Sequence, residues 1–298
     1  MELNTLLQYK PYSTARPEKR ALYAGLLTEL TQFHRERCPE YGRLLDALGC
    51  PAHMDCTVEN TPMLPVSLFK ELELRSIPEG EVFKTITSSG TTGQRVSRIF
   101  LDGATSACQQ QALCQIMSDF LGERRLPFLV LDSRQVLRNR AMFSARGAGI
   151  LGFSIFGTRP CYALDEHMEL DLDGVRAFLE EHQGETIFLF GFTFMIWKHV
   201  VRALEERGER LDIPNGILVH GGGWKKLAGE AVSPGEFKAR VAAATGVERV
   251  SNYYGMAEQT GCIYMECPQG HLHASLWSDI VVRRGRIRLR KKWSEWTW

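Results

Sequence analysis

The sequence has no long apolar run and no excess of charge of either sign. No stretch approaches the roughly 20 apolar residues that span a bilayer, and residues 1–20 lack the apolar segment of a secretory signal. Its 36 Lys and Arg residues nearly balance 35 Asp and Glu residues, for a formal net charge of +1. We therefore expect no membrane span and no electrostatic binding to nucleic acid or to an anionic membrane.

Cysteine is not concentrated in any part of the chain, and the sequence has no internal repeat or low-complexity tract. Scattered cysteines suit a reduced cytosol better than a disulfide framework, so we expect a cytoplasmic protein. The eight are Cys38, Cys50, Cys56, Cys108, Cys114, Cys161, Cys262 and Cys267. With 298 residues, of which 44% are hydrophobic, the chain can form one large domain or two smaller ones.

What is present is an alternation of strand-like and helix-like segments. Apolar residues at intervals of three and four, or in short continuous runs, mark the two types. We expect helices over 17–48, 103–122, 171–183, 193–207 and 234–245, and strands over 81–87, 95–102, 127–132, 186–190, 216–220 and 247–254. Residues 133–166 are less regular and are expected to run over the surface. The alternation predicts an α/β fold with a largely parallel sheet flanked by helices.

The segment TSSGTTG (87–93) joins the first two expected strands. Ser, Thr and Gly all favour a flexible surface turn. The alternative is a phosphate site, because glycines allow backbone amides to converge on an anion and hydroxyls add further donors. The spacing and lysine of a Walker A loop are absent.

Two further segments follow expected strands. HGGGWKK (220–226) places three glycines at the carboxyl end of a strand, where a flat ring such as a purine can approach the backbone. NYYGMAEQTG (252–261) supplies aromatic rings for stacking and Glu258 for a metal ion. Taken separately, the first is equally a strand-to-helix turn, and the second is equally core tyrosines with a solvated glutamate.

In this order, the three segments resemble the adenylate-forming superfamily of acyl-CoA synthetases. A narrower resemblance, to the LuxE-type acyl-protein synthetases, extends over roughly residues 20–283. The segments that carry it are TPMLPVSLFKE (61–71), HGGGWK (220–225), YYGMAEQTG (253–261) and GHLHASLWSDIVVR (270–283). The fold that it implies is the large domain of an adenylate-forming enzyme.

The resemblance also implies a reaction, two partners and a set of site residues. A carboxylic acid, in this family a fatty acid, attacks ATP to give an acyl-adenylate, and a thiol on an acceptor protein or carrier then takes the acyl group. The β- and γ-phosphates would lie on Ser88, Ser89, Gly90, Thr91, Thr92 and Gly93. The adenine would lie against Gly221, Gly222, Gly223, Tyr254 and Gly255, with Tyr254 stacked on the ring. Glu258 would hold Mg²⁺, and the catalytic residues would be Thr91, Thr92 and Glu258.

The sequence departs from the family pattern in two places. Many relatives have a lysine shortly after the phosphate loop, whereas this chain continues with QRVSR, so that Arg95 or Arg98 could supply the charge. The family continues beyond the HLH and WSD motifs to a small C-terminal domain, but this sequence ends at residue 298. We therefore expect an adenylate-forming domain over 1–283, a basic, Trp-rich tail over 284–298 and no small domain.

Two alternatives stay open. With the small domain absent, the chain could be a truncated, catalytically incomplete module that binds nucleotide or an acyl chain. Separately, Cys262, Cys267, His271 and His273 are zinc-ligand types, although their spacing fits no standard structural site and ordinary core residues are favoured. If the chain is an enzyme, we expect residues 88–93, 221–223 and 254–258 to converge on one cleft. The acyl pocket is then expected to lie partly in residues 133–166.

Overall fold

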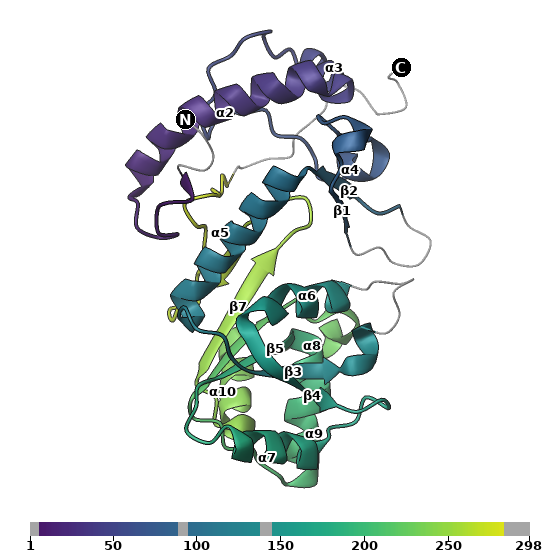
Figure 1. The fold of residues 1–298 in the computed structure, drawn as a ribbon, viewed down its shortest axis with the longest axis vertical. Coiled ribbons are helices and arrows are strands. Elements are labelled where there is room, and N and C mark those ends of the chain that lie inside the picture. The colour runs from purple at the N-terminus through teal and green to yellow at the C-terminus, as the bar shows by residue number, and fades with distance from the viewer. Residues whose placement is uncertain (1–5, 89–94, 138–144, 283–298) are drawn as a thin grey trace.

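The computed structural model describes residues 6–88, 95–137 and 145–282 (Figure 1). Its main body is a seven-stranded sheet in the spatial order β4-β3-β5-β6-β7-β8-β9. The strands are β3 Leu126–Ser133, β4 Gly157–Leu164, β5 Ile187–Phe192, β6 Gly216–Gly221, β7 Arg249–Gly255, β8 Ile263–Glu266 and β9 Leu272–His273. The first five in this order are parallel, and β8 and β9 are antiparallel to their neighbours. The predicted α/β fold with a mainly parallel sheet is confirmed.

The centre of the sheet is built from continuous apolar runs. Every residue of β5 is buried, because a central parallel strand is covered on both faces and has no side that can remain polar. Aromatic rings fill one face: Phe128 of β3 stacks on Phe188 of β5, with 4.9 Å between ring centroids. Phe190 stacks in the same way on Phe153, with 4.3 Å between centroids. These stacked rings make one face of the sheet centre apolar.

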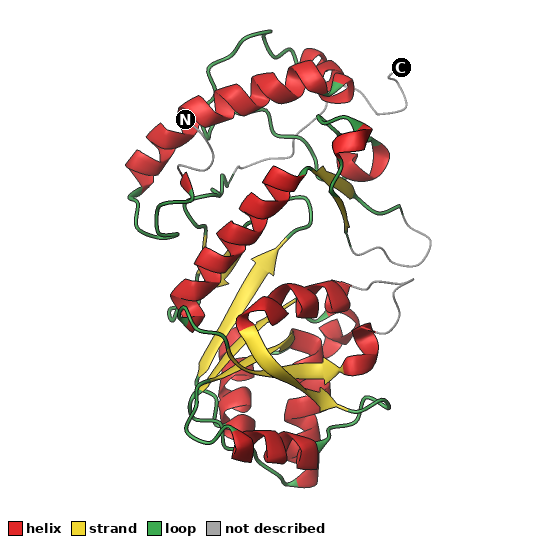
Figure 2. Ribbon diagram, viewed as in Figure 1, coloured by secondary structure: helices red, strands yellow, loops and turns green. Residues whose placement is uncertain are grey.

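Helices cover the two faces of the sheet (Figure 2). Phe153 ends α6, Ala145–Phe153, so the Phe190 side of β5 faces α6. Gly191 points the other way, since successive strand residues alternate, and it faces Ile196 of α8, Thr193–Ile196. The second face is also covered by a π-helical turn at Trp197–Val201 and by α10, Pro234–Thr245, where Trp197 stacks on Phe237. The chain also forms α7, Leu172–Glu181, and α9, Arg202–Arg207.

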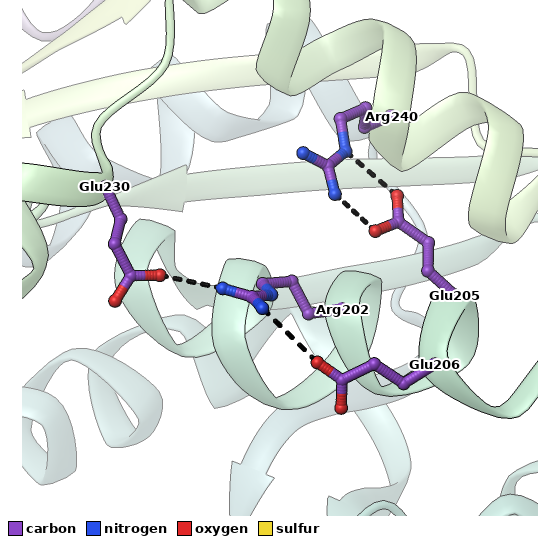
Figure 3. A network of polar contacts seen from close by, with 5 residues as sticks. All are labelled: Arg202, Glu205, Glu206, Glu230 and Arg240. Atoms are coloured by element: carbon purple, nitrogen blue, oxygen red, sulfur yellow. Dashed lines mark hydrogen bonds and ion pairs between the residues drawn. The ribbon is translucent and has the colours of Figure 1, made fainter.

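A network of ion pairs joins the outer helices of this second face (Figure 3). Arg202 of α9 lies 3.0 Å from Glu230 and 3.4 Å from Glu206. Arg240 of α10 makes a two-point contact with Glu205 and lies over the Trp197 ring at 4.2 Å. Such partly exposed pairs stabilise a fold by up to about 1 kcal/mol each. The network is therefore a modest brace between α9 and α10.

The N-terminal part contains two long helices and a small antiparallel sheet. The elements are α2 Arg16–Arg37, α3 Pro39–Ala47, α4 Leu68–Glu71, β1 Lys84–Thr87, β2 Arg98–Leu101 and α5 Gly103–Leu121. The pairing of β1 with β2 confirms the expected hairpin-like connection. Arg249 of β7 donates to the Phe120 carbonyl of α5 at 3.2 Å, so α5 ties this part to the large sheet. No helix within the described ranges has both the length and the apolarity needed to cross a bilayer.

Two sequence-based expectations about these elements are wrong. The single helix expected over 17–48 breaks at Cys38, which has extended backbone angles (φ −120°, ψ 97°). The cause is Pro39, whose ring disfavours helical geometry in the preceding residue. The irregular surface stretch expected over 133–166 contains α6 and β4, which joins the sheet beside β3. The prediction was wrong because glycines are typical of loops. Gly149 instead lies within α6, where a Cβ would be 3.0 Å from the Phe192 ring.

Helix α2 holds the segment that follows β9. The buried Lys19 donates from Nζ to the carbonyls of Ser275, at 2.8 Å, and Ser278. Tyr23 donates its hydroxyl to the Leu276 carbonyl at 2.6 Å. These contacts satisfy backbone carbonyls that have no strand partner, so the motif HLHASLWSD is fixed against the N-terminal helix. The boundary expected at residue 283 and the tail beyond it lie outside the described residues.

Candidate active site

The strand order places a reversal between β3 and β5. From β3 the chain moves outward to β4 and then returns to β5 on the other side of β3. In parallel α/β sheets, ligands bind outside the carboxyl ends of the strands at such a reversal. Asp132, Phe192 and Gly221 lie at the carboxyl ends of β3, β5 and β6. A ligand site is therefore expected at this edge.

The glycines at the end of β6 permit very close packing. A Cβ at Gly221 would lie 2.6 Å from the Tyr253 ring, and one at Gly222 would lie 2.4 Å from the Phe192 ring. Gly222 and Gly223 also have left-handed backbones, with φ of 78° and 63°. A side chain at 222 would thus meet both strain and collision, whereas at Gly223 nothing lies within 4 Å. The chain bends here, and its three glycines carry no side chains that would cover the backbone.

A buried threonine and histidine fix the carbonyl of Gly221. The Thr193 Oγ1 lies 3.1 Å from the Gly221 carbonyl and 2.9 Å from Nδ1 of His220. Thr193 has one hydroxyl proton, so both contacts are satisfied when it donates to Gly221 and accepts from His220. Nε2 of His220 then carries no proton and has no hydrogen-bond partner among the described residues. Burial, with a smaller effect of Lys238, lowers the pKa of His220 to about 3.

The two tyrosines of β7 face opposite sides of the strand. Tyr253 packs against Phe153 with 5.0 Å between ring centroids, and burial raises its pKa to about 12. Tyr254 is 50% exposed, and its ring lies 6.1 Å from that of Tyr264. Gly255 pairs with Ile263 of β8 and ends the strand. The ring predicted to stack on adenine is therefore accessible.

Glu258 lies in the turn after β7 and is half-buried. Within the described part of the chain it makes no hydrogen bond or ion pair. A half-buried carboxylate without a protein partner suits a divalent cation, which would supply the missing opposite charge. The residue fits the predicted Mg²⁺ ligand, and its role stays a prediction.

Ser88 directly follows β1 and closes the base of the loop between the two small strands. Its Oγ accepts from the Ser97 amide at 2.9 Å, and its own amide donates to the Ser97 carbonyl at 3.2 Å. Ser89, Gly90, Thr91, Thr92 and Gly93 lie outside the described residues. Gly221 lies against the Tyr253 ring and Gly222 against the Phe192 ring, whereas Ser88 belongs with the separate β1–β2 sheet. Convergence of all three segments stays a prediction.

The two arginines considered as substitutes for the family lysine each have a carboxylate neighbour. Arg95 lies 3.3 Å from Glu71, and Arg98 lies 3.5 Å from Glu73. These exposed pairs are weak, but each places a negative charge beside the positive one. Neither arginine is an uncompensated cation.

Sequence reasoning missed an acid–base pair on the same edge. Asp132 is fully buried at the end of β3, and its Oδ2 lies 3.2 Å from Nε of Arg146 on α6. The Ser133 amide also donates to Asp132, at 2.7 Å. Burial raises the pKa of Asp132, and Arg146 and this amide oppose the rise. The available signal for Asp132 was its position at the end of the apolar run PFLVLD. Arg146 was missed because it lay in the segment expected to be irregular.

The pair shares a face of the sheet with Phe192. Asp132 contacts Arg146 of α6, and Gly149 of the same helix lies against the Phe192 ring, so both side chains face α6. Arg146 also donates from Nη1 to the Met195 sulfur at 3.3 Å. The edge thus presents an aromatic ring, a bare glycine backbone and a guanidinium anchored by a buried carboxylate.

The four residues considered for zinc do not form a site. Cys262 is buried and its thiol contacts the Trp277 carbonyl at 3.4 Å. Cys267 and His271 are joined through their backbones, with 2.9 Å between amide and carbonyl. No group of three or more His, Cys, Asp or Glu side chains within the described ranges is placed to hold a metal ion.

Comparisons with known proteins agree with this fold. The family model described as acyl-protein synthetase, LuxE, matches residues 2–289. Among solved structures, 2-hydroxyisobutyryl-CoA ligase in the postadenylation state, in complex with R3-HIB-AMP, is similar at 16% identity and a TM-score of 0.56. The match covers 86% of this chain and 54% of the ligase, so the chain spans about half of that protein's length. At this identity the likeness shows the fold alone.

A second solved structure is the amide bond synthetase McbA from Marinactinospora thermotolerans. It is 16% identical, with a TM-score of 0.39 over 67% of this chain and 34% of that one. A comparison with curated proteins gives no match.

The packing at the end of β6 makes a testable distinction between neighbouring glycines. Gly222→Ala should lower the free energy of unfolding by about 2–4 kcal/mol, since it adds overpacking against Phe192 to left-handed strain. Gly223→Ala carries the backbone strain alone and should cost about 1–2 kcal/mol. Urea unfolding of both variants measures the difference, and equal losses would show that Phe192 does not occupy this space.

The buried His220 predicts a pH dependence of stability. Its native pKa of about 3 lies below the unfolded value of about 6.5, so its contribution is complete above pH 6.5 and is lost as the pH falls toward 3. From pH 7 to pH 5 the wild type should lose about 2 kcal/mol more unfolding free energy than His220→Gln, which cannot titrate. Urea unfolding at the two pH values measures this loss, and parallel losses in both proteins would contradict the buried neutral imidazole.

Proposed function

This chain belongs to the LuxE acyl-protein synthetase family, and from that membership we propose that it activates a carboxylic acid with ATP to form an acyl-adenylate. The observation that carries the proposal is the family match over residues 2–289, which includes every segment proposed for the site. The similar CoA ligase is described in a postadenylation state with an AMP conjugate, and that chemistry supports the same reaction class here.

The adenine ring is proposed to lie between the backbone of Gly221–Gly223 and the ring of Tyr254. Support comes from the bare, left-handed glycines at 222 and 223 and from the accessible tyrosine on the neighbouring strand. An aromatic ring stacked on a base contributes about 1–3 kcal/mol. The flat backbone on one side and the ring on the other suit a planar ligand.

The phosphates are proposed to lie on residues 88–93, whose hydroxyls and amides are suitable donors. Glu258 would hold Mg²⁺, which supplies positive charge to the phosphate oxygens when bound. The bonds between Ser88 and Ser97 fix where this loop leaves β1. Thr91 and Thr92 would donate hydrogen bonds to the departing pyrophosphate.

In the proposed reaction a carboxylate oxygen forms a bond to the α-phosphorus. The bond from that phosphorus to the bridging oxygen breaks, and pyrophosphate leaves with the electron pair. Little covalent work falls to the protein, so its contribution is to position the reactants and to stabilise charge. The buried Asp132–Arg146 pair and Phe192 lie at the same sheet edge and would form part of the acid's surroundings.

Two finer parts of the proposal concern the partners. We propose a fatty acid as the acid and a protein or carrier thiol as the acyl acceptor, as family membership suggests. We place the reaction in the cytoplasm, where ATP is abundant. The eight cysteines, all of them free thiols, suit a reducing compartment.

The test of the reaction is carboxylate-dependent exchange of labelled pyrophosphate into ATP, over a panel of acids from acetate to long-chain fatty acids. The proposal predicts exchange that depends on one class of acid, because adenylation is reversible before any thiol is added. Nucleotide binding without exchange for every acid in the panel would contradict it and favour the incomplete binding module.

Two variants separate the proposed roles of Tyr254 and Glu258. Tyr254→Ala should weaken ATP binding by about tenfold with or without Mg²⁺, because stacking needs no metal. Glu258→Gln should weaken binding only when Mg²⁺ is present and should lower exchange. Titration calorimetry measures both, with Tyr9→Ala and Glu248→Gln as exposed controls. Equal Mg²⁺ dependence in Glu258→Gln and the wild type would remove Glu258 from the metal site.

A further inference from the structure

The proposed reaction brings two anions together, and this inference rests on that proposed function. A carboxylate and the α-phosphate must approach to bonding distance, and like charges repel strongly in a cleft of reduced dielectric. A cation at the meeting point would offset this repulsion. Arg95 and Arg98 already have Glu71 and Glu73 beside them, and Arg146 has Asp132.

Lys225 is a cation without such a neighbour among the residues that the structure describes. Its Nζ lies 5.6 Å from the ring centroid of Phe192 and 5.6 Å from that of Phe194. Within the described part of the chain no carboxylate lies within ion-pair distance of this ammonium. Ring contacts of an exposed lysine contribute only about 0.5–1 kcal/mol each, so they orient the ammonium without neutralising its charge.

The backbone of Lys225 is strained in a way that fits a functional position. Its φ of 47° lies in the left-handed region, which is costly for a residue with a Cβ. Such strain persists where the surrounding structure enforces it, and it clusters at active sites and ligand clamps. Positions 222 and 223 have the same left-handed backbone without strain, because both are glycine. Position 225 has a long cationic side chain instead.

Phe192 connects this ammonium to the candidate site. Its ring fills the space beside Gly222 and lies under Lys225, and like Asp132 of β3 it faces α6. The ammonium therefore stands at the carboxyl edge of β5 and β6, next to the glycines proposed to hold the adenine. The α-phosphate is the phosphate nearest to a bound adenosine.

We propose that Lys225 is a further catalytic residue, whose ammonium binds the α-phosphate oxygens where the carboxylate attacks. As the carboxylate oxygen bonds to phosphorus and pyrophosphate departs with its electron pair, the ammonium stabilises the charge on the non-bridging oxygens and stays protonated. Phe192 and Phe194 are positioning residues for it. The Lys225 ammonium would supply the positive charge that Arg95 and Arg98, each beside a carboxylate, do not supply.

The test compares three substitutions at position 225 with a control, Lys198→Met. Lys198 is an exposed lysine in the π-helical turn Trp197–Val201. Titration calorimetry gives the affinities of each protein for adenosine, AMP and Mg²⁺–ATP, and pyrophosphate exchange gives the rate. Lys225→Met should bind AMP at least about tenfold more weakly, the loss of one hydrogen bond to a charged group, with adenosine affinity unchanged. Lys225→Arg should restore most of the AMP affinity, and Lys198→Met should match the wild type.

Lys225→Gly separates binding from folding. Glycine accepts the left-handed backbone, so the urea midpoint should not fall, while AMP affinity drops as in Lys225→Met. Affinity for AMP that is unchanged in both variants would overturn the proposal, as would an equal loss for adenosine and AMP, which indicates a structural role. Absence of exchange in the wild type would count against the proposed function, and the adenosine–AMP comparison would still decide the contact of Lys225 with phosphate.

Discussion

The Phe192 ring occupies the space that a side chain at residue 222 would need. A Cβ at Gly222 would lie 2.4 Å from this ring. Gly149 of α6 also packs against the ring, where a Cβ would lie 3.0 Å away. One aromatic side chain thus determines how closely α6 and the turn after β6 can approach the sheet. It also lies beneath Lys225 and, like Asp132, faces α6, so a change in its position would move the glycines and the charges together. The geometry of the candidate site depends on this packing.

The charges around this edge differ in how fully they are compensated. Asp132 is fully buried, and the guanidinium of Arg146 makes that burial tolerable. His220 is kept neutral by burial, and through Thr193 it holds the Gly221 carbonyl in place. Glu258 and Lys225 are accessible, and within the described part of the chain neither is paired. An anionic nucleotide with a divalent cation would supply what both of them lack.

The sequence was sufficient to predict the central elements. Strands 127–132, 186–190 and 216–220 are apolar runs bounded by turn residues, and burial on both faces leaves this unambiguous pattern. The edge strand β4 was missed because it is only partly buried and contains Pro160, which an edge position tolerates. Helix α6 was missed because Gly147, Gly149 and Gly152 resemble loop residues, although Gly149 serves close packing against Phe192.

The site was predictable only where a motif lies in one continuous segment. The glycines at 221–223 and the pair Tyr254 and Glu258 were proposed in this way. Asp132, Phe192 and Lys225 belong to three different segments, and their relation depends on strand register and on a bend after β6. We expect one adenylate to contact both sides of this edge. A crystal structure with a non-hydrolysable acyl-adenylate analogue should show adenine between Tyr254 and Gly221–Gly223 and the phosphate mimic beside Lys225. An analogue bound elsewhere would refute this site.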